Sequence, residues 1–392
     1  MFRLLLKNLR QLSAAVLLLC FTAVVAEVWL QLTEQGGADT GVRCRRFAPT
    51  PLIVPSTTAH HELRRLSEYR TAAGRTAPIR INSLGMRGDE PAARPAADVL
   101  RILILGDDTV FGAALPEQQT LSALVAELVR KNSAADAEVI NGGVPGDCPL
   151  LSILRFRNEW SRLQPDIVVL HVDMSDVADD ALYRTSLKEE HGSSVCPNPL
   201  LETPHSECHP LVRLVRKSAL CRKLTENLCE TQNGSALPDA SRRNCYAWTL
   251  QHTGNLQLQV RHALEPIIRL QKLAEQNGFR LMISVSPVPW QLTQPESADT
   301  PQTPMRLLSM LSGQLQTAFC DAQPAFRSFS APEKLYVGDT PELSRYGTAL
   351  YARELTRCLL QSPQTAALFQ STDGSRTAGG RELRLKNAAL TR

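Results

Sequence analysis

The pattern of apolar and polar residues changes near residue 79. From residue 33 to residue 79 the chain is polar, is interrupted by glycine and proline, and has weak periodicity, which indicates a stalk or linker. After it, short apolar runs alternate with segments that carry apolar residues at helical spacing. This alternation is typical of βαβ units and predicts a parallel sheet with helices on both faces.

The apolar runs predict five strands, and the helical segments between and after them predict the flanking layers. The first run, RILIL, is continuous after Arg101, as expected of a strand buried on both faces of the sheet. The fold class is therefore a three-layer α/β/α sandwich with a five-stranded parallel sheet of the flavodoxin-like type. The predicted strands are residues 101–105, 137–140, 166–172, 280–285 and 326–329. The predicted helices are residues 120–131, 150–163, 256–277, 305–320 and 344–360.

The alternation lapses over residues 181–254, where cysteine, proline, serine and asparagine cluster, and we interpret this segment as an insertion. The tail, residues 362–392, has few large apolar residues and is expected to be loose. Half of the ten cysteines crowd into the insertion without the C-x-x-C spacing of a zinc ribbon, so in an oxidising compartment some of them are expected to be paired. These five are Cys196, Cys208, Cys221, Cys229 and Cys245.

The N-terminus carries an apolar segment, residues 12–32, behind three basic residues. Basic residues before an apolar segment keep the N-terminus in the cytoplasm, so the body of the chain is expected to be exported. Small residues before Glu27 allow cleavage by signal peptidase, but the apolar character continues through Trp29 to a length that spans a membrane. We favour a retained transmembrane anchor over residues 1–32, which would hold the protein by a single pass in the cytoplasmic membrane with its body in the periplasm.

The composition indicates a folded protein, and the charge distribution argues against a nucleic-acid partner. With 43% hydrophobic residues the chain can bury a substantial core. The 43 basic and 39 acidic residues are spread along the chain and give a net charge of +4, so no basic face indicates nucleic-acid binding.

Four motifs fall at or near the predicted carboxyl ends of the strands, where open α/β sheets bind ligands. They are GDDTVFG at 106–112, NGGVPGD at 141–147, HVDMSD at 171–176 and DTPELSRYG at 339–347. This series resembles the SGNH hydrolases, also called GDSL esterases or lipases. The preceding INSLGMRG at 81–88 resembles the lead-in of membrane-anchored bacterial members. The resemblance covers residues 80–361 apart from the insertion, and it implies the SGNH fold for them.

The resemblance also implies which positions form the site. In the family, a serine attacks an ester carbonyl, a histidine removes its proton, and a glycine and an asparagine help to hold the oxyanion. Here the serine position is Asp108, the histidine position is Glu342 and the asparagine position is Ser175. The glycine is kept as Gly146 and the aspartate that orients the base as Asp339. The scaffold positions are kept while the reacting groups are replaced.

Three hypotheses account for the acid at residue 108. Asp108 can cap the N-terminus of the next helix. Alternatively, Asp107, Asp108, Asp339 and Glu342 together can coordinate a hard cation such as Ca²⁺ or Mg²⁺. Finally, two carboxyl groups could act as the catalytic pair of a glycosidase. His171 is expected to be a structural histidine, and the aspartates that follow it are expected to bind N–H groups of their loop.

The sequence therefore favours a membrane-anchored SGNH-like protein that has lost ester hydrolysis and serves in binding or assembly at the cell envelope. Its partner would be envelope carbohydrate or another envelope protein, with no cofactor. The alternative is an active hydrolase, an esterase, a carbohydrate O-acyl hydrolase or a glycosidase-like enzyme, that uses a carboxylate-rich or metal-assisted site.

Overall fold

A computed structural model gives the fold of the chain. All but one of the residues that it describes belong to one of two compact units, which comprises Cys44–Glu202 and Asp239–Arg392. The predicted anchor lies outside the described residues apart from Thr22. Within the described part of the chain, no helix has both the length and the apolar character needed to cross a membrane. The described residues are 22, 51–70, 78–96, 98–173, 175–190, 193–202, 254–293, 303–338, 340 and 342–370.

The centre of the fold is a five-stranded sheet in the order β11-β10-β7-β5-β6, with every neighbouring pair parallel. Numbered along the chain this is the order 2-1-3-4-5, which is the doubly wound order of flavodoxin-like folds. The predicted five-stranded parallel sheet is confirmed. The strands are β5 (Val99–Gly106), β6 (Asp136–Gly143), β7 (Ile167–Val172), β10 (Arg280–Val285) and β11 (Ala318–Asp321).

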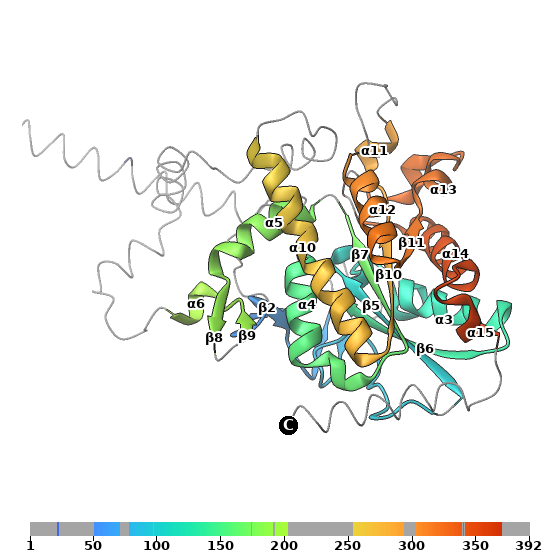
Figure 1. Cartoon of the computed structure of the whole chain (residues 1–392), viewed down its shortest axis with the longest axis horizontal. Helices are drawn as coiled ribbons and strands as arrows, with labels where there is room; N and C mark the ends of the chain where they lie inside the picture. Colours follow the sequence, from blue (N-terminus) through green and yellow to red (C-terminus); the bar gives the residue numbers. More distant parts are fainter. Residues whose placement is uncertain are drawn as a thin grey trace, which may run out of the picture. The chain divides into compact units, whose positions relative to one another are not determined.

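Helices cover both faces of this sheet (Figure 1). Successive residues of β5 point to opposite faces, and all but Val99 are buried, which accounts for the continuous apolar run from Ile102 to Leu105. Leu103 and Leu105 pack in one core with α4, α10 and α12, while Ile102 and Ile104 pack in the other with α3, α13 and α14. These helices are α3 (Leu121–Asn132), α4 (Pro149–Asn158), α10 (Gly254–Asn277), α12 (Thr303–Leu315), α13 (Gln323–Arg327) and α14 (Arg345–Gln361).

The prediction of the fifth strand was wrong in position. Residues 326–329 begin inside α13, where Phe326 is buried in the core, and the strand is β11. The predicted helix of residues 305–320 ran through this strand. In the structure α12 ends at Leu315 because Gln316 adopts the left-handed conformation, with φ of 53°. Ala318 and Cys320 are then free to enter the sheet.

The described part of the predicted stalk, residues 51–70, is folded onto the domain. It forms β1 (Ile53–Pro55) paired with β2 (His61–Leu63), and β3 (Ser67–Tyr69) paired with β4 (Ile79–Ile81). Leu52, Ile53 and Leu63 are buried in the core that also contains α4 and α10. Strands of three residues are too short to give a periodic signal, which is why the sequence indicated a linker.

The domain also extends past the predicted start of the loose tail. A further helix, α15 (Ala366–Phe369), buries Phe369 in the core beside α14. The predicted start of the tail at residue 362 is therefore too early, and residues 371–392 lie outside the described part of the chain.

The predicted insertion starts inside α5 (Asp176–Tyr183), and its described part contains the hairpin of β8 (Lys188–Glu190) and β9 (Ser193–Val195), and α6 (Pro199–Glu202). Cys196 is a buried free thiol that donates to the Tyr183 carbonyl over 3.3 Å, so it is not one of the paired cysteines. The other four cysteines of the insertion lie outside the described residues.

Two adjacent histidines of the N-terminal segment are buried against the domain. Nδ1 of His60 lies 3.2 Å from Nδ1 of His61, and Nε2 of His61 bonds to the Pro145 carbonyl over 3.1 Å. Burial lowers the pKa of His60 to about 4. Burial, together with the charge of Arg155 and of His60, lowers the pKa of His61 well below its usual value. Both rings are therefore neutral in the folded protein at neutral pH.

This pair predicts a loss of stability on acidification. Below pH 6.5 the unfolded chain takes up a proton at each histidine, whereas the folded chain does not do so at His60 until about pH 4 and holds His61 neutral well below its usual pKa. The free energy of unfolding therefore falls as the pH is lowered from 6.5. Each group contributes up to about 1.4 kcal/mol per pH unit. Urea denaturation between pH 7 and pH 4.5 measures the slope, which the double variant His60→Gln, His61→Gln should flatten. His262→Gln, at an exposed histidine, is the control, and equal slopes in the two variants would contradict the assignment.

Candidate functional site at the carboxyl edge of the sheet

The loops that follow β5, β6 and β7 meet at one edge of the sheet. The chain passes from β5 to β6 on one side and then to β7 on the other side of β5. In open α/β sheets, such a reversal of strand order is where ligands usually bind. Asp107 and Asp108 follow β5, Gly146 follows β6, and Asp173 and Ser175 follow β7. Three of the four sequence motifs are thus brought together.

The two aspartates after β5 have different roles from those that the sequence suggested. The helix α2 (Asp108–Phe111) begins at Asp108, and its N-cap is Asp107, whose carboxylate accepts the N–H of Thr109 over 3.1 Å. The hypothesis that Asp108 is the N-cap is therefore wrong by one residue. This releases the Asp108 carboxylate for another contact.

The Asp108 carboxylate accepts the backbone N–H of Gly146 over 3.2 Å. Gly146 has φ of 72°, a conformation that favours glycine. Its carbonyl accepts the hydroxyl of Tyr183 over 2.9 Å, which holds the peptide from the other side. A carboxylate thus occupies the N–H group that, according to the resemblance, would hold an oxyanion.

Glu342 binds the loop after α2. Its carboxylate accepts the N–H of Ala114 over 2.9 Å. Burial raises the pKa of Glu342, while the Ala114 bond and the Arg87 charge oppose the rise. Arg87 is buried and donates to the carbonyls of Phe111 (2.9 Å) and Leu115 (2.6 Å), so this arginine of the INSLGMRG lead-in fixes the same loop.

The loop after β7 uses its polar groups internally. The Ser175 N–H (2.6 Å) and hydroxyl (2.7 Å) both donate to Oδ1 of Asp173. The N–H of Asp173 donates to Asp176 over 2.7 Å. Both aspartates bind loop N–H groups, as predicted, and the Ser175 hydroxyl points to a carboxylate.

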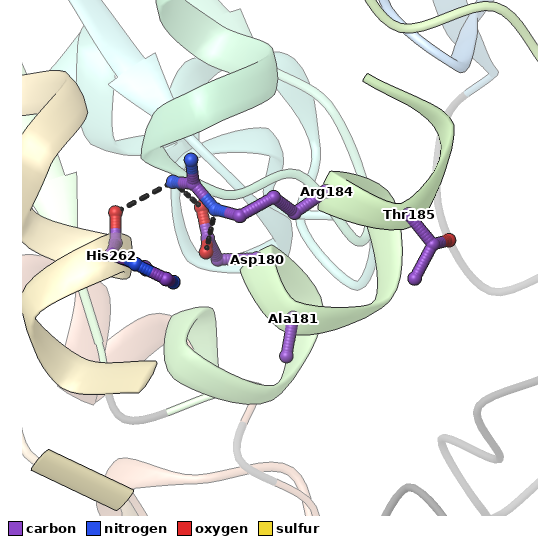
Figure 2. Close-up of a pocket in the computed structure, with 5 residues that line it drawn as sticks. All are labelled: Asp180, Ala181, Arg184, Thr185 and His262. Carbon is purple, nitrogen blue, oxygen red and sulfur yellow. Dashed lines mark hydrogen bonds and ion pairs between the residues drawn. The ribbon is translucent and has the colours of Figure 1, made fainter. Parts of the chain in front are cut away.

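The surface pocket of Figure 2, about 290 Å³, is lined by other residues. They are Asp180, Ala181, Arg184, Thr185 and His262. Arg184 forms two 2.9 Å bonds with Asp180 and donates to the His262 carbonyl over 2.7 Å. The pocket contains none of the predicted site residues, and its principal charges are paired with one another.

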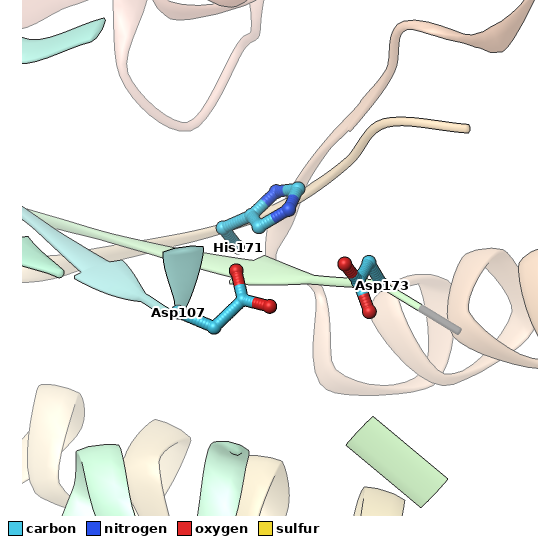
Figure 3. Close-up of side chains that lie close together, drawn as sticks. All are labelled: Asp107, His171 and Asp173. Carbon is cyan, nitrogen blue, oxygen red and sulfur yellow. The ribbon is translucent and has the colours of Figure 1, made fainter. Parts of the chain in front are cut away.

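The predicted cation site is not the cluster that the described residues form. Asp107, Asp108 and Glu342 have the separate N–H partners given above, and Asp339 lies outside the described residues. Asp107 instead lies with His171 and Asp173 (Figure 3), with one coordinating atom of each within 4.8 Å of the others.

The spacing of His171 and Asp173 in the sequence is a signal for this cluster. His171 is in β7 and Asp173 is two residues later, so both side chains lie on the same side of an extended segment. Burial and the charges of Asp173 and Asp108 raise the pKa of Asp107 well above its usual value. Burial lowers the pKa of His171 to about 4.

Cys148 follows the Gly146 loop directly. It is buried, and burial and the charges of Asp180 and Asp176 raise its pKa well above the usual value. A thiol in this state is not a nucleophile at neutral pH.

No protein-family model and no curated protein sequence matches the chain. Among solved structures, a lipolytic protein of the G-D-S-L family from Desulfitobacterium hafniense matches with 13% identity over 66% of this chain and 99% of its own, at a TM-score of 0.34. A lipase/acylhydrolase from Enterococcus faecalis matches with 14% identity over 66% and 94%, at 0.33. An acetylxylan esterase from Geobacillus stearothermophilus matches with 13% identity over 66% and 93%, at 0.37.

These identities and TM-scores are low, and no residue of this chain takes its role from the matched structures. The order of the sheet and the place of the motifs come from the chain itself. These three proteins are described as a G-D-S-L lipolytic protein, a lipase/acylhydrolase and an acetylxylan esterase, and the five-stranded parallel sheet with flanking helices of this chain is the one that its sequence predicted.

Proposed function

We propose that this chain is an SGNH-like protein of the bacterial cell envelope that is held in the cytoplasmic membrane by its N-terminal segment and no longer hydrolyses esters. Its role is binding or assembly, with envelope carbohydrate or another envelope protein as the partner. The basic N-terminus and the apolar segment that follows it support the location. Mass analysis of the mature N-terminus tests the anchor, and a chain that begins at Glu27 would contradict it.

The hydrogen bond between Asp108 and Gly146 is the main observation that supports the proposed loss of ester hydrolysis. In a serine esterase, this corner supplies a hydroxyl, and the glycine N–H waits for the oxyanion. Here a carboxylate is in the corner and accepts that N–H. A substrate oxyanion at the same N–H would face a like charge instead of an unoccupied donor. At the position of the histidine base the chain has Glu342, whose carboxylate already accepts the N–H of Ala114. The imidazole that would activate a hydroxyl is therefore missing from this position.

We expect no labelling of the purified full-length chain by a fluorophosphonate and no hydrolysis of p-nitrophenyl acetate above the buffer rate. Labelling is read by intact mass, and hydrolysis by release of p-nitrophenolate. Robust hydrolysis that is abolished by Asp108→Ala would contradict the proposal and support the alternative, an active carboxylate or metal-assisted hydrolase. The raised pKa of Glu342 is the observation that favours this alternative, because a general acid must stay protonated.

The double variant Asp108→Ser, Glu342→His provides the matched positive control. It restores the hydroxyl and the imidazole while leaving the rest of the loop intact. We expect fluorophosphonate labelling to appear with at most weak turnover, because Ser175 stands where the family has an oxyanion asparagine, and loss of one such donor costs about 10² to 10³ in rate. The single variant Asp108→Ser is expected to remain unlabelled.

A further inference from the structure

We propose that Asp107, His171 and Asp173 bind one divalent transition-metal ion at the carboxyl edge of the sheet. One coordinating atom of each residue lies within 4.8 Å of the other two, and the three side chains face one another in Figure 3. Their residues are 7%, 2% and 5% exposed. The proposed loss of ester hydrolysis does not require this site, so the two proposals stand separately.

The imidazole of His171 has one bonded and one unbonded nitrogen. Nδ1 lies 2.8 Å from the Tyr351 hydroxyl, which in turn lies 2.7 Å from the hydroxyl of Ser284. Nε2 is buried and has no hydrogen-bond partner in the described part of the chain. Histidines that bind metals use one nitrogen for the ion and the other for a partner that fixes the ring. Tyr351, from α14, is such a partner.

The two carboxylates are held in position by their own loops. Asp107 accepts the N–H of Thr109, and Asp173 accepts the N–H and the hydroxyl of Ser175. The carboxylates of Asp107 and Asp173 are both buried and lie close enough to repel each other. A bound cation would offset this repulsion between buried acids.

The donor set selects the class of ion. Ca²⁺ and Mg²⁺ prefer ligand sets made of oxygen alone, whereas an imidazole nitrogen suits zinc, iron and their neighbours in the first row. Three side chains leave at least one coordination position for water or a ligand, as in catalytic zinc sites. The site therefore differs in both residues and ion from the four-carboxylate site that the sequence suggested.

Co²⁺ is a suitable probe for the full-length chain after removal of metal by a chelator, because its visible spectrum distinguishes nitrogen and oxygen ligands from thiolates. We expect one equivalent to bind, with d–d bands and without thiolate charge-transfer bands, and the melting temperature to rise. Competition with Zn²⁺ should remove the bands. Absence of a stoichiometric site would overturn the proposal.

Variants assign the site to these residues. His171→Gln and Asp173→Asn are expected to weaken Co²⁺ binding at least tenfold, whereas Glu342→Gln leaves it unchanged. Circular dichroism and thermal melting confirm that each variant is folded. If His171→Gln does not fold, the variant Tyr351→Phe is used to test the site. It removes the hydrogen-bond partner of His171, and loss of such a partner weakens metal binding by about 10- to 100-fold. Binding that survives in folded His171→Gln or in Tyr351→Phe, or that is lost in Glu342→Gln, overturns the proposal.

Discussion

Replacing Asp147 by alanine is expected to lower the free energy of unfolding by about 3 to 5 kcal/mol. Asp147 is fully buried, and its Oδ2 lies 2.5 Å from Nη1 of Arg155, whose side chain is 5% exposed. Without the carboxylate, the guanidinium would remain inside the domain without its counter-charge. Chemical denaturation followed by circular dichroism measures the change.

Two control variants show how much of the expected loss in Asp147→Ala comes from leaving a buried charge without its partner. Glu127→Ala removes an exposed ion pair with Lys131 on α3 and should leave the free energy of unfolding almost unchanged, because solvent screens this pair. The double variant Asp147→Leu, Arg155→Met replaces the buried pair by apolar groups and should recover part of the loss. Recovery is incomplete because Arg155 also donates to the His61 carbonyl over 2.6 Å. A loss below about 1 kcal/mol in Asp147→Ala would show that solvent reaches Arg155.

The ion pair matters for the site because Asp147 directly follows Gly146. Asp147 also accepts the hydroxyl of Ser152 in α4 over 2.9 Å, so the loop is tied to the helix behind it. Loosening of this tie should shift the Gly146 N–H away from Asp108. The contact that we propose to exclude an oxyanion thus depends on a buried ion pair behind the Gly146 loop.

The sheet was predictable because its central strands are continuous apolar runs with buried residues on both faces. The limits of β10 were predicted to the residue, and those of β7 to within one residue. Short strands without a continuous apolar run were not predicted from the sequence. The strands β1 to β3 have three residues each and mix polar with apolar positions. Their burial depends on contacts with α4 and the Gly146 loop, which local periodicity does not encode.

The location of the site was predictable, and the partners of its side chains were not. Parallel strands place their following loops at one edge, so the motifs after β5, β6 and β7 had to meet. Which acid caps α2 depends on where the helix begins, and sequence boundaries are uncertain by a residue or more. His171 and Tyr351 are 180 residues apart, and no local pattern relates them.

Gly143→Ala is expected to be among the most damaging single changes in the domain, with a loss above about 4 kcal/mol in the free energy of unfolding. Gly143 is the last residue of β6, and α2 packs directly on it. A Cβ at this position would lie 2.3 Å from the backbone nitrogen of Phe111 and 2.7 Å from the carbonyl carbon of Val110. Backbone atoms cannot rotate away as a side chain can, so α2 would have to shift.

The matched control is Gly313→Ala, in the exposed face of α12, where an added Cβ has no neighbour within 4 Å. Alanine favours a helix over glycine, so this variant should gain about 0.5 to 1 kcal/mol. The shift of α2 in Gly143→Ala should also move Asp108 away from Gly146 and Asp107 away from His171. The melting temperatures of the two variants should therefore change in opposite directions. Equal stability of Gly143→Ala and the parent chain would mean that α2 does not pack against β6 as described.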